Sequence, residues 1–82
     1  MKKIPDLPKA FGKVMAEARA QQGMSQERLA ETIGSTNVYI SMLENGQRQP
    51  SLNAALLIAQ ELKIQPEELV ARVSMILSNS KS

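Results

Sequence analysis

Apolar side chains recur at steps of three and four residues along most of the chain, and this spacing places them on one face of a helix. The pattern predicts helices over about 9–22, 26–33 and 37–44, followed by two more that begin at Ser51 and Pro66. No alternating, β-branched stretch of strand length remains between these segments. The pattern therefore indicates an all-α fold of five helices.

Glycine and proline mark the ends of the predicted helices. Glycines stand where three of the patterns stop, as left-handed C-terminal caps prefer, and prolines stand where three begin: Gly23, Gly34 and Gly46; Pro8, Pro50 and Pro66. Ser25 and Thr36 precede the second and third helices, where a side-chain oxygen can accept a hydrogen bond from an unpaired backbone N–H.

The apolar positions also predict which side chains form the core. The inward sets of the first three helices are Phe11, Val14, Met15 and Ala18; Leu29, Ala30 and Ile33; and Ile40 and Leu43. The fifth helix carries more apolar side chains than one stripe needs, and we assign Val73, Ile76 and Leu77 to a homodimer interface. In the alternative, Val70, Ile76 and Leu77 only complete the core of one chain.

Length and composition limit the class of protein. Eighty-two residues support one core, so we expect a single domain with its core over about 9–77 and flexible ends at 1–7 and 78–82. Because the chain has no Cys and no His, we expect no metal, no cofactor and no enzymatic activity. The absence of a membrane-length apolar run suggests a cytoplasmic protein without a membrane partner. Because the five predicted helices occupy most of the 82 residues, we expect no small-molecule effector.

The net charge of +2 permits a polyanionic partner without requiring one. Residues 1–24 hold five Lys or Arg and two Asp or Glu, a local charge of 5 − 2 = +3. This excess suits a first helix that faces a polyanion, and binding to such a partner would be sensitive to salt. Lys9, Lys13 and Arg28 are the candidate contacts, although such charges also serve solubility alone.

The most informative motif is Q-x3-A-x3-G-x5-I-x2-L, formed by Gln26, Ala30, Gly34, Ile40 and Leu43. Two helices that cross within a tight turn need a small residue where they approach and a glycine where the backbone reverses. With Ile40 and Leu43 inward, the helical period turns an uncharged face outward, made of Asn37, Val38, Ser41, Met42 and Asn45. This face is small enough to enter a major groove.

At these residues the chain resembles the Cro/cI-type (XRE-family) helix-turn-helix proteins. The resemblance is carried by MSQERLAETIGSTNVYISMLENGQRQPS, extends through LNAALLIAQELKIQPEELV, and covers about residues 11–70. It implies a compact five-helix, lambda-repressor-like domain. It also implies a sequence-specific regulator, most often a repressor, which binds a pseudo-palindromic operator in double-stranded DNA as a homodimer.

The resemblance implies roles for individual residues. Four residues of the third helix correspond to base-reading positions: Asn37, Val38, Ser41 and Met42. An Asn amide suits adenine, and Val or Met suits a thymine methyl group. Six residues correspond to contacts with the DNA backbone: Gln26, Thr36, Tyr39, Asn45, Gln47 and Arg48. Arg19 and Glu44 correspond to a structural ion pair of the family.

The chain departs from the family pattern at two places, and it allows one alternative function. The third helix has no Lys or Arg, which puts guanine readout in doubt, and Arg28 stands where a glutamate is frequent. The second function is an antitoxin-type protein-interaction module of the same fold, which would act mainly through its C-terminal helix. Burial of the apolar residues 75–77 in a stable homodimer would favour the operator-binding regulator. Their exposure in the purified chain and capture of a toxin would favour the antitoxin.

Overall fold

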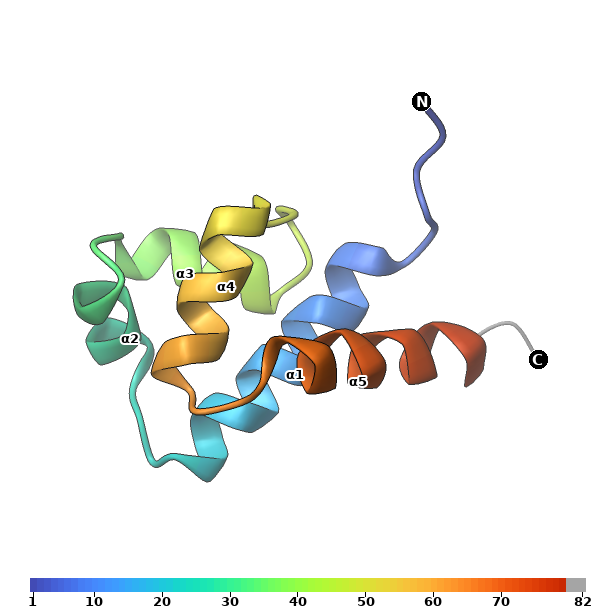
Figure 1. Ribbon diagram of the computed structural model, residues 1–82. Helices are drawn as coiled ribbons and strands as arrows, with labels where there is room; N and C mark the ends of the chain where they lie inside the picture. The colour runs from blue at the N-terminus through green and yellow to red at the C-terminus, as the bar shows by residue number, and fades with distance from the viewer. Residues whose placement is uncertain (80–82) are drawn as a thin grey trace.

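The computed structural model describes residues 1–79, and this range contains five helices and no strand (Figure 1). The helices are α1 (Leu7–Gln21), α2 (Gln26–Thr32), α3 (Asn37–Glu44), α4 (Leu52–Glu61) and α5 (Pro66–Asn79). The predicted all-α class with five helices is therefore confirmed. Among residues 1–79, none of the helices combines the length and apolar character needed to cross a membrane.

The two outer helices extend further than the sequence pattern predicts. Helix α1 begins at Leu7, two residues early, because Pro8 lies inside its first turn, where a missing N–H needs no partner. Helix α5 continues to Asn79. Leu7, Ser78 and Asn79 are thus helical, residues 80–82 lie outside the described range, and the flexibility of the two ends stays a prediction.

The predicted caps of the two central helices are present. The Ser25 hydroxyl accepts a hydrogen bond of 3.0 Å from the Arg28 N–H, and the Thr36 hydroxyl accepts one of 3.1 Å from the Tyr39 N–H. Each cap satisfies one backbone donor that the first helical turn leaves unpaired. Local sequence therefore defines where α2 and α3 begin.

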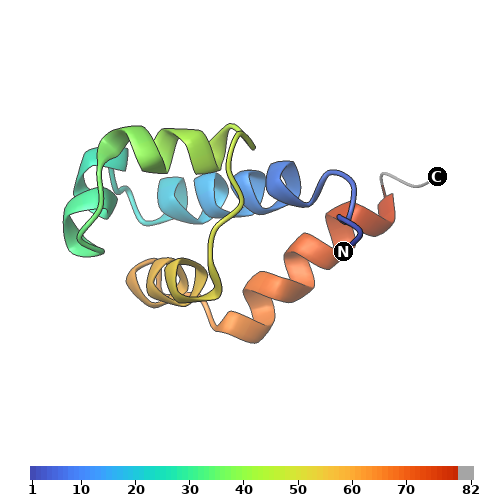
Figure 2. The same ribbon diagram turned by 90° about the horizontal axis from the view of Figure 1, so that it is seen from above.

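Helix α1 is central to the packing, with α3 along one side and α5 along the other (Figure 2). The five large side chains with the least exposure are Met15, Leu29, Ile40, Leu43 and Ile58. All predicted inward residues of α1, α2 and α3 are buried except Ile33, which is partly buried and packs against the core. The predicted core is therefore largely confirmed.

Gly12 allows α1 and α3 to approach until their backbones touch. A Cβ atom at this position would lie 2.4 Å from the carbonyl oxygen of Leu43 and 2.6 Å from that of Glu44. Both are backbone atoms, which cannot rotate away as a side chain can. A glycine in the middle of a helix costs about 1 kcal/mol relative to alanine, so this contact explains its presence.

Helix α4 is apolar on most sides, and only part of it faces the core. Ile58, Ala59 and Leu62 are buried, whereas Leu52 is 76% exposed and Leu56 is 45% exposed. The hydrophobic pattern alone does not separate these two groups, because apolar residues occupy seven of the ten positions of the helix. The structure thus leaves an apolar surface on α4.

Candidate nucleic-acid interface

Helices α2 and α3 form a compact unit joined by a tight turn. Gly34 has a positive φ of 71°, and the Ala30 carbonyl accepts a hydrogen bond of 2.8 Å from the Ser35 N–H. Ala30 is 3% exposed, and both Ile40 and Leu43 are fully buried. The small, glycine and buried positions of the predicted turn motif are therefore placed as their chemistry requires, and the opposite side of α3 faces outward.

A shallow hollow of about 420 Å³ lies between the start of α2, the outward face of α3 and the residues that follow it. Its lining consists of Gln26, Asn37, Val38, Ser41, Met42 and Gln47. The structure therefore brings together all four residues that we predicted to read bases and two of the six predicted to contact the DNA backbone.

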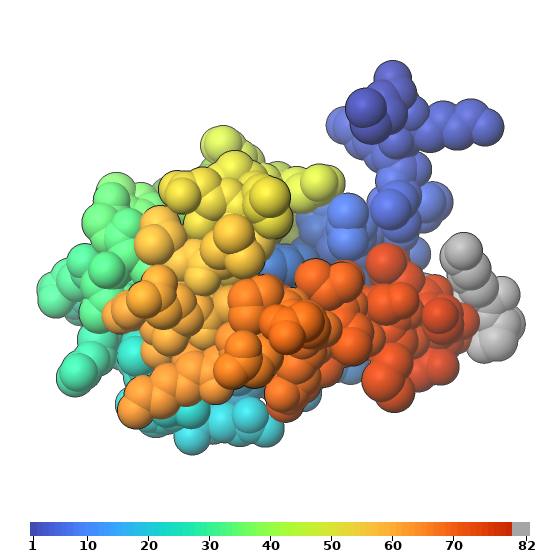
Figure 3. Space-filling view, in the orientation of Figure 1, coloured from blue at the N-terminus to red at the C-terminus, as the bar shows by residue number. Residues whose placement is uncertain are grey.

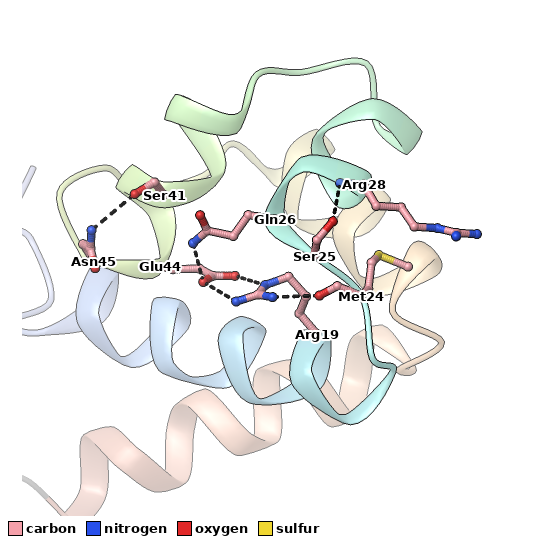
Figure 4. Close-up of polar contacts among 8 residues, drawn as sticks. All are labelled: Arg19, Met24, Ser25, Gln26, Arg28, Ser41, Glu44 and Asn45. Carbon is pink, nitrogen blue, oxygen red and sulfur yellow. Dashed lines mark hydrogen bonds and ion pairs between the residues drawn. The ribbon is translucent and has the colours of Figure 1, made fainter.

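The Arg19–Glu44 ion pair connects α1 to the end of α3 (Figure 4). Arg19 Nε donates to Glu44 Oε2 at 2.6 Å, and a terminal guanidinium nitrogen donates to Glu44 Oε1 at 3.0 Å. The other terminal nitrogen donates to the Met24 carbonyl oxygen at 2.7 Å. The guanidinium therefore ties α1 both to α3 and to the segment that leads into α2.

The surroundings of Arg19 favour its charged form. The Arg19 and Glu44 side chains are 20% and 7% exposed, so the pair is largely shielded from water. Hydrogen bonding to Glu44 raises the pKa of Arg19 above its ordinary value, burial opposes this, and the charge of Glu44 adds to it. Because this pKa is raised, the contribution of charged Arg19 to the stability of the fold is complete below the ordinary pKa of Arg. It decreases only when the pH rises above that value.

Gln26 also binds Glu44, a contact that sequence reasoning missed. Its side-chain Nε2 donates to Glu44 Oε1 at 2.9 Å, and Figure 4 shows its amide oxygen turned away from that carboxylate. Three helices thus meet at Glu44. The spacing of 18 residues between Gln26 and Glu44 follows no local rule, so only the crossing of α2 and α3 reveals it.

Tyr39 and Arg48 contact each other. The Arg48 guanidinium carbon is 5.9 Å from the centre of the Tyr39 ring, which is within the range of a cation–π contact. Tyr39 is partly buried and packs against the core. Its ring therefore supports Arg48, which makes Tyr39 a positioning residue as well as a candidate for contact with phosphate.

Asn45 and Thr36 make local contacts. The Asn45 side-chain nitrogen donates to the Ser41 hydroxyl at 3.5 Å (Figure 4), and the Thr36 hydroxyl caps α3. Both residues are exposed at opposite ends of α3. They flank the outward face of that helix, and their contacts with the DNA backbone stay a prediction.

The structure separates the three candidate cations. The Cα and Cγ atoms of Lys9 lie against Gly46, so Lys9 is beside the segment that follows α3. Lys13 instead lines a hollow together with Arg72 and other α5 residues. Arg28 points away from the Gln26–Glu44 cluster, toward the end of α4 (Figure 4). Only Lys9 is therefore brought to the end of α3.

The structure buries one of the three residues that the sequence assigns to a dimer interface, and the interface itself stays a prediction. Val73 is 7% exposed because it packs in the core of the chain, so it offers little surface to a second copy. Ile76 and Leu77 are partly buried against that core. The large apolar side chains that α5 exposes are Val70 and Met75, each 66% exposed.

Two short helices crossing at a glycine turn, with an uncharged outward face on the second, define a helix-turn-helix of the DNA-binding class. Residues 15–69 match the protein family described as helix-turn-helix, so the chain belongs to the helix-turn-helix family of transcriptional regulators. The uncharacterized HTH-type transcriptional regulator y4dJ of Sinorhizobium fredii is 34% identical over 65 residues, which are 79% of this chain and 84% of the relative. The uncharacterized HTH-type regulator YgzD of Bacillus subtilis is 40% identical over 53 residues, or 65% of this chain and 80% of the relative.

Solved structures share the fold. The restriction-modification controller protein C.AhdI of Aeromonas hydrophila superposes with a TM-score of 0.72 at 40% identity, covering 76% of this chain and 94% of that protein. The clp gene regulator ClgR of Corynebacterium glutamicum superposes with a TM-score of 0.88 at 22% identity, covering 96% of this chain and 84% of that one. The second likeness concerns the fold alone.

Proposed function

We propose that this regulator is a repressor that binds a pseudo-palindromic operator in double-stranded DNA as a homodimer, with α3 in the major groove. The observation that carries the proposal is the hollow along α3, where Asn37, Ser41 and Gln47 surround Val38 and Met42. A helix fits the major groove, and Asn and Ser side chains can reach the base edges there. The 40% identity to a restriction-modification controller protein supports a regulatory role.

Contacts with phosphates are assigned to residues around this hollow. Gln26 is held by Glu44 with its amide oxygen turned away, and its second amide hydrogen is free to meet a phosphate. Arg48 on the Tyr39 ring and Lys9 beside Gly46 supply positive charge near α3. Such contacts determine the position of the helix in the groove and make the affinity depend on salt.

The homodimer follows from the small size of the reading surface. One module contacts few base pairs, whereas a two-fold dimer reads two half-sites that lie about 34 Å apart. We assign the interface to the α4–α5 face, defined as Leu52, Leu56, Val70 and Leu77. Leu56 and Pro66 line one hollow of about 560 Å³, and Leu52 and Val70 lie one turn from them. Figure 3 shows α4 and α5 forming the front of the molecule with no other element over them.

Selection of bound duplexes from a random pool tests the proposal. We expect a two-fold symmetric consensus, with half-sites spaced by one helical turn and an affinity that falls as salt is raised. Recovery of no consensus, together with no salt-dependent binding to any duplex, would reject it. An asymmetric consensus would reject the homodimer and leave DNA binding in place.

A further inference from the structure

Val38 and Met42 form the apolar part of the hollow along α3. They are four residues apart, so they lie one turn apart on the same face of the helix. Val38 is 69% exposed, and Met42 is partly buried beside it. A single exposed valine needs no explanation, but here the apolar pair lies at the centre of the surface that we assign to DNA.

The polar groups around this pair are partly engaged with one another. Gln26 donates to Glu44 at 2.9 Å, and Asn45 donates to Ser41 at 3.5 Å. No Lys, Arg, Asp or Glu is among the six residues that line the hollow. Arg or Lys normally reads guanine, and Asp or Glu accepts from cytosine, so the hollow lacks the charged groups that read a G·C pair.

The C5 methyl group of thymine is the apolar group that a base pair presents in the major groove. Cytosine methylated at C5 carries the same group at the same ring position. We propose that Val38 and Met42 form a binding site for the C5 methyl group of a pyrimidine, so that the protein distinguishes thymine or 5-methylcytosine from unmethylated cytosine. The inference rests on the proposed function, because it requires α3 to lie in the major groove.

A consequence is that DNA methylation changes binding. At a half-site with cytosine at the contacted position, methylation would supply the missing methyl group and strengthen the complex. Such a response needs no additional domain, because the methyl group belongs to a base that α3 itself contacts. The regulator would then respond to the chemical state of its operator as well as to its sequence.

The experiment replaces each thymine of the selected duplex by deoxyuridine, one symmetric pair at a time, which removes only the methyl group. At one position per half-site we expect the affinity to fall about fourfold for each half-site, the size expected for the burial of one methyl group. Replacing that base pair by C·G should weaken binding further. Using 5-methylcytosine there should recover part of the loss.

Two variants connect the effect to the named residues. Val38→Ala should bind the thymine and uridine duplexes with equal affinity, and the exposure of Val38 means that the change spares the core. Leu57→Ala alters an exposed residue of α4 and should keep the full discrimination. A thermal unfolding curve for each variant checks that the fold is retained.

The outcomes separate this inference from the proposed function. If deoxyuridine leaves the affinity unchanged at every thymine position, the proposed operator-binding function stands and the methyl-binding site is rejected. Full discrimination by Val38→Ala overturns it equally, because other residues would then read the methyl group. A protein that binds no duplex overturns both.

Discussion

The side-chain amide of Gln26 donates a hydrogen bond of 2.9 Å to Glu44, so the first residue of α2 is held by the last residue of α3. Glu44 in turn accepts two hydrogen bonds from Arg19 on α1. One carboxylate therefore orients the side chain that we propose to meet a phosphate. Orientation before binding reduces the conformational entropy that the complex must lose.

Replacing Glu44 by Ala should lower the free energy of unfolding by about 2 kcal/mol, more than the 0–1 kcal/mol of an exposed ion pair, because Arg19 is left partly buried without a counter-charge. Urea denaturation measures the change. Glu68→Ala is the control, since it breaks an exposed ion pair. The side chains of Glu68 and its partner Arg72 are 50% and 39% exposed. Equal losses for the two variants would contradict the structural role of Glu44.

Asn37→Ala and Gln26→Ala should weaken DNA binding in different ways. Loss of the Asn37 amide should relax the preference at one base pair per half-site and cost about 1–3 kcal/mol at that pair. Loss of Gln26 should weaken binding to all sequences alike. Competition with single-base variants of the selected duplex distinguishes the two patterns, and unchanged affinity for both variants would reject the assignment.

Lys9→Ala and Arg48→Ala should each reduce the slope of log affinity against log salt by about one, since each removes one phosphate contact. Lys13→Ala carries the same loss of net charge, but Lys13 lines a hollow with α5 residues and should leave the slope unchanged. Titrations at four or more salt concentrations measure the slopes. Three equal slopes would show that only net charge matters.

Gly12→Ala should reduce the free energy of unfolding by about 1–3 kcal/mol, because the added methyl group overlaps the α3 backbone. Gly23→Ala is the comparison, since Gly23 has a positive φ of 65° and no neighbouring atom within 4 Å of an added Cβ. It should cost roughly 1 kcal/mol, from backbone strain alone. Only Gly12→Ala should also displace α3. Its affinity for DNA should therefore fall further than that of Gly23→Ala.

Val70→Glu should convert the proposed homodimer to a monomer, because it places a charge on the α4–α5 face. Met75→Glu is a matched control: Met75 is also 66% exposed but lines the hollow beside Glu17 and Arg72. Sedimentation of both variants, with the circular dichroism spectrum as a check of folding, gives the result. A parent chain that sediments as a monomer would reject the homodimer and favour a different protein partner for this face.

Local patterns were sufficient for the helices and their caps. The positions of Ser25, Thr36 and Gly34 depend on hydrogen bonds and backbone angles within a few residues, so the sequence predicts the boundaries of α2 and α3 to within one residue. The inward residues of the first three helices follow from the helical period, and the predicted Arg19–Glu44 pair is present. The early start of α1 is the exception, because Pro8 can either precede a helix or occupy its first turn.

Contacts between distant segments required the packed structure. The role of Gly12 depends on the distance between α1 and α3, and the Gln26–Glu44 bond depends on the crossing of α2 and α3. The helical period places Val73 at the centre of the apolar surface of α5 and Val70 at its edge, and only the packed structure shows that burial stops before Val70, which is 66% exposed. Helical periodicity defines which residues share a face, but the neighbouring helices decide which part of that face water reaches.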